Sequence, residues 1–321
     1  MSISSSPRET GVPGRVVLVA PGRALGPLAP LIDAYQEGRP VEVVRGEDLT
    51  GLDGHLEAAD AVLVVAAPRR SPRTVLPGVA VETAAGRRIP VGVVPNLGDD
   101  ALRRFARAAA SVHARPDGRP SVALLAQRSP RYRDLAGRVG RVLTERTPAT
   151  PVSWWTADRL VRDDLATGLG LGLGVALYVG HGRPVGWVGY RGTRAHHLPT
   201  PEAPVGAILS LACLTASRRR TGLSFGEALV MRGCAAASLA AVKRTLHLDN
   251  ARWALGIARA LAEGAATIGE LVVLAEPPAA DRCYRILGDP LAPLRDTPGA
   301  RDAAREFEDL VVFPSPGPVA S

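Results

Sequence analysis

The chain has 321 residues, a length that allows one large α/β domain or two modest ones. Hydrophobic residues make up 46% of it, which excludes a chain that is disordered throughout. The net charge of +8 comes mainly from arginines in short clusters, such as residues 218–220, without the interleaved aromatic residues on which bases would stack. Composition therefore argues against a nucleic-acid partner.

Cysteine usage and the first residues narrow the class of protein further. No CxxC pair or repeated spacing links Cys213, Cys234 and Cys283, which argues against a disulfide framework and against a metal site. We expect no bound cofactor. Residues 1–15 lack the apolar stretch of a signal peptide, and the apolar runs elsewhere are too short to span a bilayer. The sequence predicts a cytoplasmic protein with no membrane partner.

The first third of the chain alternates apolar strands with helical segments, after residues 1–14, which we expect to be disordered. Strands are predicted at Arg15–Ala20, Ala61–Ala66 and Ile89–Val94, and helices at Leu28–Glu37 and from Asp99 to about His113. Acidic residues suit the start of the second helix because its first backbone N–H groups are unpaired. The alternation predicts a parallel sheet in a smaller α/β subdomain, residues 15–113.

A second α/β unit follows a predicted linker at Ala114–Pro120. Its predicted strands are Ser121–Ala126, Val175–Gly180 and Ala207–Ala212, and its predicted helices are Asp134–Arg146, Ser224–Arg232 and Ala251–Glu263. Ser224 followed by Glu227 fits a helix-capping box. For Ala235–Val242, periodicity leaves a strand and a buried helix equally open. Residues 298–321 are predicted to be a polar, proline-rich tail.

Two apolar strands of this second unit end abruptly in a reactive side chain. VALYVG is followed by His181 and Gly182, and AILSLA is followed by Cys213. The carboxyl ends of neighbouring parallel strands share one edge of the sheet, so a thiol and an imidazole would meet there. The imidazole could then activate the thiol as a nucleophile. The N–H groups of Gly182 and Cys213 could form an oxyanion hole.

Each of these signals has a common structural explanation. A cysteine after an apolar strand usually belongs to the core, and a His-Gly pair usually forms a turn. Both together, at the ends of predicted neighbouring strands, leave the catalytic and the structural interpretation equally open.

Several further motifs resemble the gingipain family of cysteine peptidases. LYVGHG resembles the family's YxGHG histidine segment, and SLACLTA resembles its nucleophile segment, with Ala216 where a glycine is commoner. Trp187, SFGEALV, the segment from Asn250 to Trp253, and ILGDP resemble further family elements in the same order along the chain. The resemblance covers about residues 89–295.

This resemblance implies a fold and an activity. The fold would be α/β: a caspase-like three-layer αβα sandwich with a mostly parallel sheet over residues 119–297, preceded by residues 15–113 as a degenerate first half. The activity would be that of a cysteine endopeptidase acting on a peptide or protein substrate. Cys213 would be its nucleophile, His181 its acid–base group, and Gly182 N–H and Cys213 N–H its oxyanion hole. The alternative is a catalytically silent caspase-like scaffold that binds a peptide or protein partner.

The resemblance also implies a preference for cleavage after basic residues, arginine before lysine. Asp134 falls where Arg-specific members bind the arginine side chain, and Trp253 falls where a tryptophan covers that pocket. A helix N-cap is the structural alternative for Asp134. Two departures accompany the likeness: residues 123–130 contain no acid to orient the histidine, and the structural calcium that the resemblance allows has no ligands that can be placed.

Overall fold

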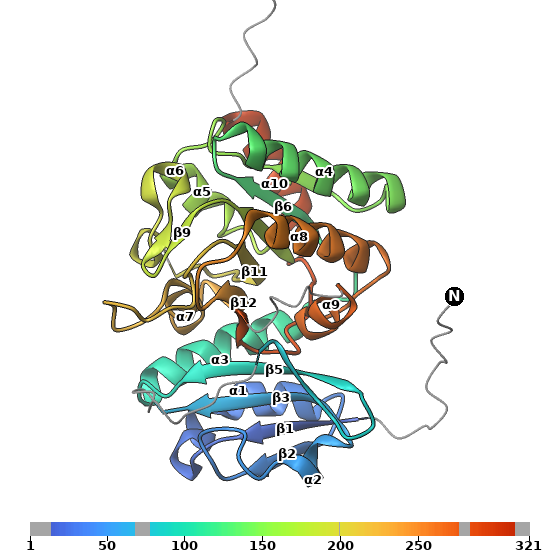
Figure 1. Ribbon diagram of the computed structural model, residues 1–321, viewed down its shortest axis with the longest axis vertical. Coiled ribbons are helices and arrows are strands. Elements are labelled where there is room, and N and C mark those ends of the chain that lie inside the picture. The colour runs from blue at the N-terminus through green and yellow to red at the C-terminus, as the bar shows by residue number, and fades with distance from the viewer. Residues whose placement is uncertain (1–13, 68–77, 199, 276–282, 312–321) are drawn as a thin grey trace, which may run out of the picture.

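The computed structural model describes residues 14–67, 78–198, 200–275 and 283–311 (Figure 1). Its strands are β1 (Arg15–Val19), β2 (Val41–Val44), β3 (Ala59–Ala66), β4 (Ala80–Glu82), β5 (Arg88–Pro95), β6 (Val122–Ala126), β7 (Val152–Trp154), β8 (Val175–Val179), β9 (Gly182–Arg183), β10 (Gly186–Trp187), β11 (Val205–Leu211), β12 (Ala235–Ala241) and β13 (Tyr284–Gly288). The α-helices are α1 (Leu25–Gln36), α2 (Asp53–Leu56), α3 (Asp99–His113), α4 (Pro130–Arg146), α5 (Arg162–Gly168), α6 (Gly189–Gly192), α7 (Phe225–Met231), α8 (His247–Ala262), α9 (Ile268–Leu274) and α10 (Ala300–Val311).

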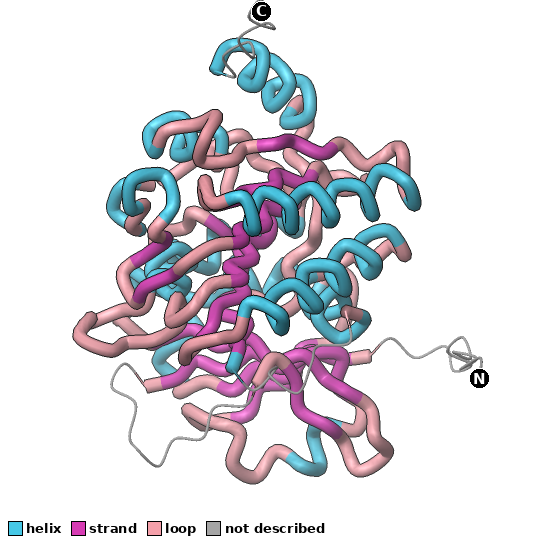
Figure 2. The backbone as a smooth tube through the Cα atoms, turned by 45° about the horizontal axis from the view of Figure 1, so that its top comes forward, coloured by secondary structure: helices cyan, strands magenta, loops and turns pink. Residues whose placement is uncertain are grey.

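One sheet runs through the described part of the chain, with helices on both sides of it (Figure 2). Its eleven strands follow the order β2-β1-β3-β5-β13-β12-β11-β8-β6-β7, and β4 pairs with β5. Two of its pairings are antiparallel, β12 with β13 and β4 with β5, and the others are parallel. The expected caspase-like αβα sandwich with a mostly parallel sheet is confirmed.

Both faces of the sheet are buried, as the apolar strand sequences predict. Successive side chains of a strand point to opposite faces, so Leu177 and Tyr178 of β8 enter two different core clusters. The first cluster includes residues of α4 and α8, and the second includes residues of α5 and α10. Polar side chains can therefore lie close together only at the ends of the strands, between the two helical layers.

Most predicted elements of the second unit are confirmed, and one ambiguity is resolved. Residues 235–241 form strand β12, because β11 and β13 pair with it on either side. Helix α7 begins after Ser224, whose hydroxyl accepts from Glu227 N while the Glu227 carboxylate accepts from Ser224 N, so the predicted capping box is present.

The region predicted as a polar tail contains a helix, α10. Ala300, Ala304 and Phe307 are buried at helical spacing, and the Phe307 ring packs edge-on against Trp155 at 5.2 Å between centroids. Charged residues separate its six apolar residues, so the segment looks polar in the sequence. Residues 312–321, like residues 1–13, lie outside the described part.

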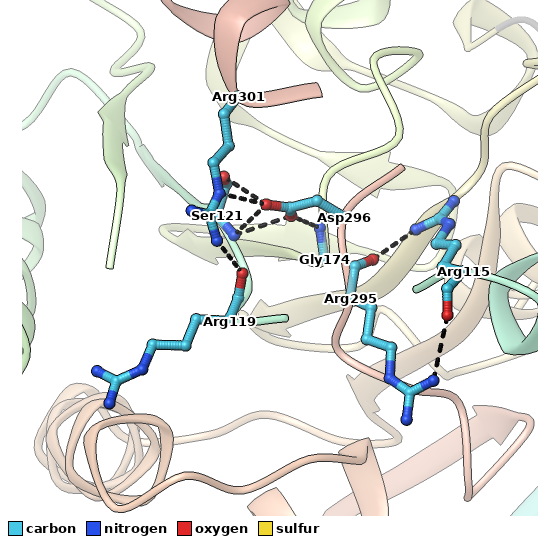
Figure 3. Close-up of polar contacts among 7 residues, drawn as sticks. All are labelled: Arg115, Arg119, Ser121, Gly174, Arg295, Asp296 and Arg301. Carbon is cyan, nitrogen blue, oxygen red and sulfur yellow. Dashed lines mark hydrogen bonds and ion pairs between the residues drawn. The ribbon is translucent and has the colours of Figure 1, made fainter. Parts of the chain in front are cut away.

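The predicted linker Ala114–Pro120 is held by a polar network (Figure 3). The Asp296 carboxylate accepts hydrogen bonds from Ser121 N and Oγ, from Gly174 N and from Arg301 Nε. The Arg115 guanidinium donates to the carbonyls of Arg295, at 2.8 Å, and of Pro204. Burial lowers the pKa of Arg115 to about 10. The amino ends of β6 and β8 are thereby tied to the chain that follows β13.

The two predicted subdomains share the sheet through β13. This strand pairs with β12 of the second unit on one side and with β5 of the first on the other. The division of the chain into two subdomains, residues 15–113 and 119–297, stays a prediction.

Candidate active site

The site lies at one edge of the sheet, where β8 and β11 end side by side. The two strands are parallel neighbours, and Val179 is the register partner of Leu211. His181 and Cys213 each come two residues after these partners. The thiol and the imidazole are therefore carried by equivalent positions on two adjacent strand tips, as the sequence predicts.

Gly182 and Cys213 bring the two tips into direct contact. A Cβ atom on Gly182 would lie 2.4 Å from the Cys213 carbonyl oxygen and 2.8 Å from Thr215 Cγ2, so no side chain fits there. Leu214, which follows the cysteine, has a φ of 65°, in the left-handed region that a leucine seldom adopts. This turn ends β11 sharply and leaves the thiol partly exposed. Strained backbone of this kind often marks a functional site.

The sulfur of Cys213 is bounded by Thr245, from the loop after β12. The Thr245 N–H donates to Sγ at 3.4 Å, and the carbonyl and hydroxyl oxygens of Thr245 lie 3.6 Å from it. Among the described residues, Sγ makes its hydrogen bonds with Thr245 and none with the imidazole.

The imidazole of His181 is exposed and bonded to residues at the start of α4. Arg131 Nη2 lies 2.9 Å from His181 Nε2, and the Tyr132 hydroxyl lies 3.4 Å from both ring nitrogens. The backbone N–H of His181 donates to Gln127 Oε1 at 2.8 Å. A guanidinium can only donate, so Nε2 must accept, and the assigned tautomer is neutral with its proton on Nδ1.

This environment keeps the imidazole neutral. Partial burial lowers the pKa of His181, and the positive charge of Arg131 lowers it further. Within the described chain the side-chain partners of the imidazole are Arg131 and Tyr132, and neither is a carboxylate. The imidazole of His181 is thus neutral, and the lone pair on its Nε2 accepts a hydrogen bond from Arg131.

Two backbone N–H groups are available at the proposed oxyanion position. In the β9–β10 hairpin, Gly182 is the register partner of Trp187. The hydrogen bond beside this pair runs from Val188 N–H to His181 O at 3.0 Å, so Gly182 and Trp187 do not bond each other. Gly182 N–H therefore points away from the hairpin. Among the described residues, Cys213 N–H makes no hydrogen bond. Both N–H groups therefore stay candidates for the predicted oxyanion hole.

The structure does not bring Asp134 and Trp253 to this edge. Helix α4 begins at Pro130, so Asp134 lies in its second turn and not at its head. Asp134 is exposed, and it lies about 200° around the helix from the buried Tyr132. Trp253 has no exposed surface, and its ring packs against Tyr284 at 5.1 Å. Neither residue faces the crevice between the strand tips.

Sequence reasoning missed the groups that contact the two candidate residues. Gln127 directly follows β6, which is the neighbour of β8 on the side away from β11, so its place at a strand end was a usable signal. Arg131 and Tyr132 belong to the same strand–helix junction. Thr245 gave no signal, because its position depends on the path of the loop after β12.

The described residues contain no group of three or more His, Cys, Asp or Glu side chains that could hold a metal ion. The calcium ion that the resemblance allows enters no step below. No described helix is long and apolar enough to cross a membrane.

A thiol and an imidazole at the edge of a caspase-like sandwich define the class of cysteine peptidases. Residues 106–295 match the family model described as peptidase family C25, and the chain belongs to that family. It is a cysteine-type peptidase, a hydrolase, as the sequence predicts. A search among curated proteins found no match.

Solved structures show the same fold. The Arg-specific cysteine proteinase gingipain R is similar with a TM-score of 0.71 and 15% identity, over 88% of this chain and 79% of that chain. The complex of pro- and mature domains of RgpB from Porphyromonas gingivalis matches at 0.67 and 15%, over 88% and 80%. A Saccharomyces cerevisiae separase–securin complex matches at 0.51 and 12%, over 72% of this chain and 15% of that one. The resemblance noted in the sequence is confirmed.

Proposed function

We propose that the chain is a cysteine endopeptidase with Cys213 as nucleophile and His181 as acid–base group. One observation carries this proposal: the thiol and the imidazole occupy equivalent positions on the tips of β8 and β11, and the backbone of Gly182 lies against that of Cys213. Membership of a peptidase family supports it.

The proposed reaction uses these groups in order. His181 Nε2 takes the thiol proton, and Sγ attacks the carbonyl carbon of the scissile peptide bond. The N–H groups of Gly182 and Cys213 stabilise the resulting oxyanion. The imidazolium gives its proton to the leaving amine as the C–N bond breaks. Water then attacks the thioester and gives one proton to His181, and the acid product leaves as Sγ recovers its proton.

The contact with Arg131 sets a condition on this reaction. Nε2 cannot take the thiol proton while its lone pair accepts from the guanidinium. Arg131 must therefore move off the imidazole before or during substrate binding. Its side chain is exposed and lies over the Tyr132 ring, so it can move without disturbing the core.

The preference for arginine before the scissile bond is supported by the relative that is described as Arg-specific. The positions of Asp134 and Trp253 do not add to that support, because the first is exposed on the far face of α4 and the second is fully buried. Peptides that differ at this one residue measure the preference directly.

The test is turnover and active-site labelling in matched variants. Cys213→Ala should abolish both hydrolysis of a peptide library and labelling by a peptidyl acyloxymethyl ketone. His181→Ala should lower turnover by about 10²–10⁴-fold, the range for loss of a general acid–base group. Cys234→Ser is the control, because that thiol is 5% exposed in the core. Normal turnover in Cys213→Ala would remove the nucleophile assignment, and a wild type with neither activity would favour the silent scaffold.

A further inference from the structure

Arg131 is a cation without an anion at the candidate active site. Its guanidinium donates to His181 Nε2 at 2.9 Å and to the Tyr132 hydroxyl at 2.7 Å, and it lies 4.5 Å from the centroid of the Tyr132 ring. Among the described residues it has no carboxylate partner. Arg133, two residues further along α4, does have one, since it pairs with Asp158 at 2.9 Å.

A neutral imidazole is a poor partner for a guanidinium. The guanidinium offers five N–H donors in a planar fork that matches the two oxygens of a carboxylate. The imidazole lone pair can satisfy only one of these donors, and it carries no negative charge. A carboxylate brought within reach would therefore displace the imidazole from Arg131.

Other exposed cations lie on the segments next to the two strand tips. Arg183 follows Gly182 on β9, and Lys243 and Arg244 lie on the loop whose Lys243 carbonyl accepts from Leu214 N at 3.1 Å. None of these three has an ion pair within the described residues. Positive charge on these neighbouring segments favours an acidic ligand.

We propose that Arg131 recognises an acidic side chain, Asp or Glu, on the residue that follows the scissile bond of the peptide substrate, because His181 protonates the amine of that residue, and that this contact releases His181 for catalysis. The inference rests on the proposed function, and it names the substrate class of the same site. The carboxylate takes the guanidinium fork, Nε2 loses its donor, and the lone pair becomes available for the thiol proton. Binding of an acidic substrate thus makes the base of the site available for the reaction.

Peptide binding to Cys213→Ala tests this proposal without depending on turnover. Fluorescein-labelled hexapeptides with arginine before the scissile bond and otherwise identical residues would carry Asp, Glu, Asn, Gln, Arg or Lys at the position after that bond. We expect the acidic peptides to bind about 10- to 100-fold more tightly than their amide counterparts, the range for a hydrogen bond between charged groups. Adding Arg131→Gln should bring that ratio close to one, and adding Arg131→Glu should make the Arg peptide the tightest.

Arg133→Gln in the same background is the matched control. It removes one positive charge from the same turn of α4 but no contact with the imidazole, so the preference for acidic peptides should persist. Three results would overturn the proposal: equal or tighter binding of the Arg or amide peptides, an acidic preference that survives Arg131→Gln, or no binding of any peptide. Labelling of Cys213 in the wild type tests the proposed function separately, so the two can fail independently.

Discussion

At the residue scale, His181 has a guanidinium on Nε2 and, among the described residues, no carboxylate on either ring nitrogen. A carboxylate stabilises the imidazolium, whereas Arg131 at 2.9 Å from Nε2 stabilises the neutral ring. The pKa of His181 is lowered by burial and by this charge. The free enzyme consequently has its base in the neutral form over a wider range of acidic pH than an isolated histidine would.

The first prediction concerns this pKa. In Arg131→Gln the positive charge beside Nε2 is gone, so the imidazolium is less disfavoured and the pKa of His181 should rise. The pH at which turnover falls on the acid side should rise with it, because the base must be neutral to accept the thiol proton. NMR titration of the imidazole protons measures the shift directly. Arg133→Gln should leave the titration unchanged, and an unchanged titration in Arg131→Gln would contradict the assigned contact.

The second prediction concerns the contact between the strand tips. Gly182→Ala places a Cβ atom 2.4 Å from the Cys213 carbonyl oxygen, so the two tips must separate. A displacement of this size in a catalytic site lowers kcat/KM by about 100-fold. Gly26→Ala in α1, where nothing lies within 4 Å of the new Cβ, is the control and should be close to wild type. Full activity in Gly182→Ala would show that the tips are not in contact.

At the element scale, the Asp296 carboxylate joins three segments that begin or end near it. It accepts from the N–H groups of Ser121, before β6, and of Gly174, before β8, and it pairs with Arg301 of α10 (Figure 3). Its side chain is 10% exposed, so these bonds are shielded from water. The network holds the amino ends of the two strands whose carboxyl ends form the site.

The third prediction tests this network. Asp296→Ala leaves two backbone N–H groups without a partner and should lower the free energy of unfolding by about 3 kcal/mol. Urea unfolding followed by circular dichroism measures the change. Asp163→Ala removes a carboxylate that is 86% exposed and should change stability by less than about 1 kcal/mol. Equal losses in the two variants would mean that the network contributes little.

At the scale of the whole molecule, a buried carboxylate couples the two halves of the sheet. Asp289, which follows β13, has no exposed surface and accepts from Tyr35 of α1 at 2.5 Å. Its other oxygen lies 2.7 Å from Nε2 of His113, the last residue of α3. Burial, with the charge of Asp289, raises the pKa of Tyr35, so the tyrosine keeps its proton and acts as the donor. Both helices belong to the predicted first half.

The fourth prediction concerns cooperativity. Because β13 is shared and Asp289 ties it to α1 and α3, we expect one calorimetric unfolding transition for the wild type. Asp289→Asn should lower the free energy of unfolding by about 3 kcal/mol, as expected for loss of a buried charge with several partners. Two transitions in the wild type would instead favour the predicted division into residues 15–113 and 119–297 as independent folding units.

The sequence by itself located six strands of the sheet, β1, β3, β5, β6, β8 and β11, and the residues at their ends. Runs such as VALYVG and AILSLA are short, continuous and apolar, as buried strands are, and a polar residue after such a run is expected at the end of the strand. That local rule located His181 and Cys213. It also made the fold class predictable, since alternating strands and helices pack as a layered parallel sheet.

Only the tertiary structure decided what surrounds those two side chains. The contact of Arg131 with His181 joins residues 50 apart in the chain, and that of Thr245 with Cys213 joins residues 32 apart. Such contacts depend on where a helix begins and on the path of a loop. Helix α4 begins at Pro130, a residue suited to a first turn, and not at Asp134. Four residues amount to slightly more than one turn, which moved Asp134 from the helix head to the solvent face and left Arg131 beside the imidazole.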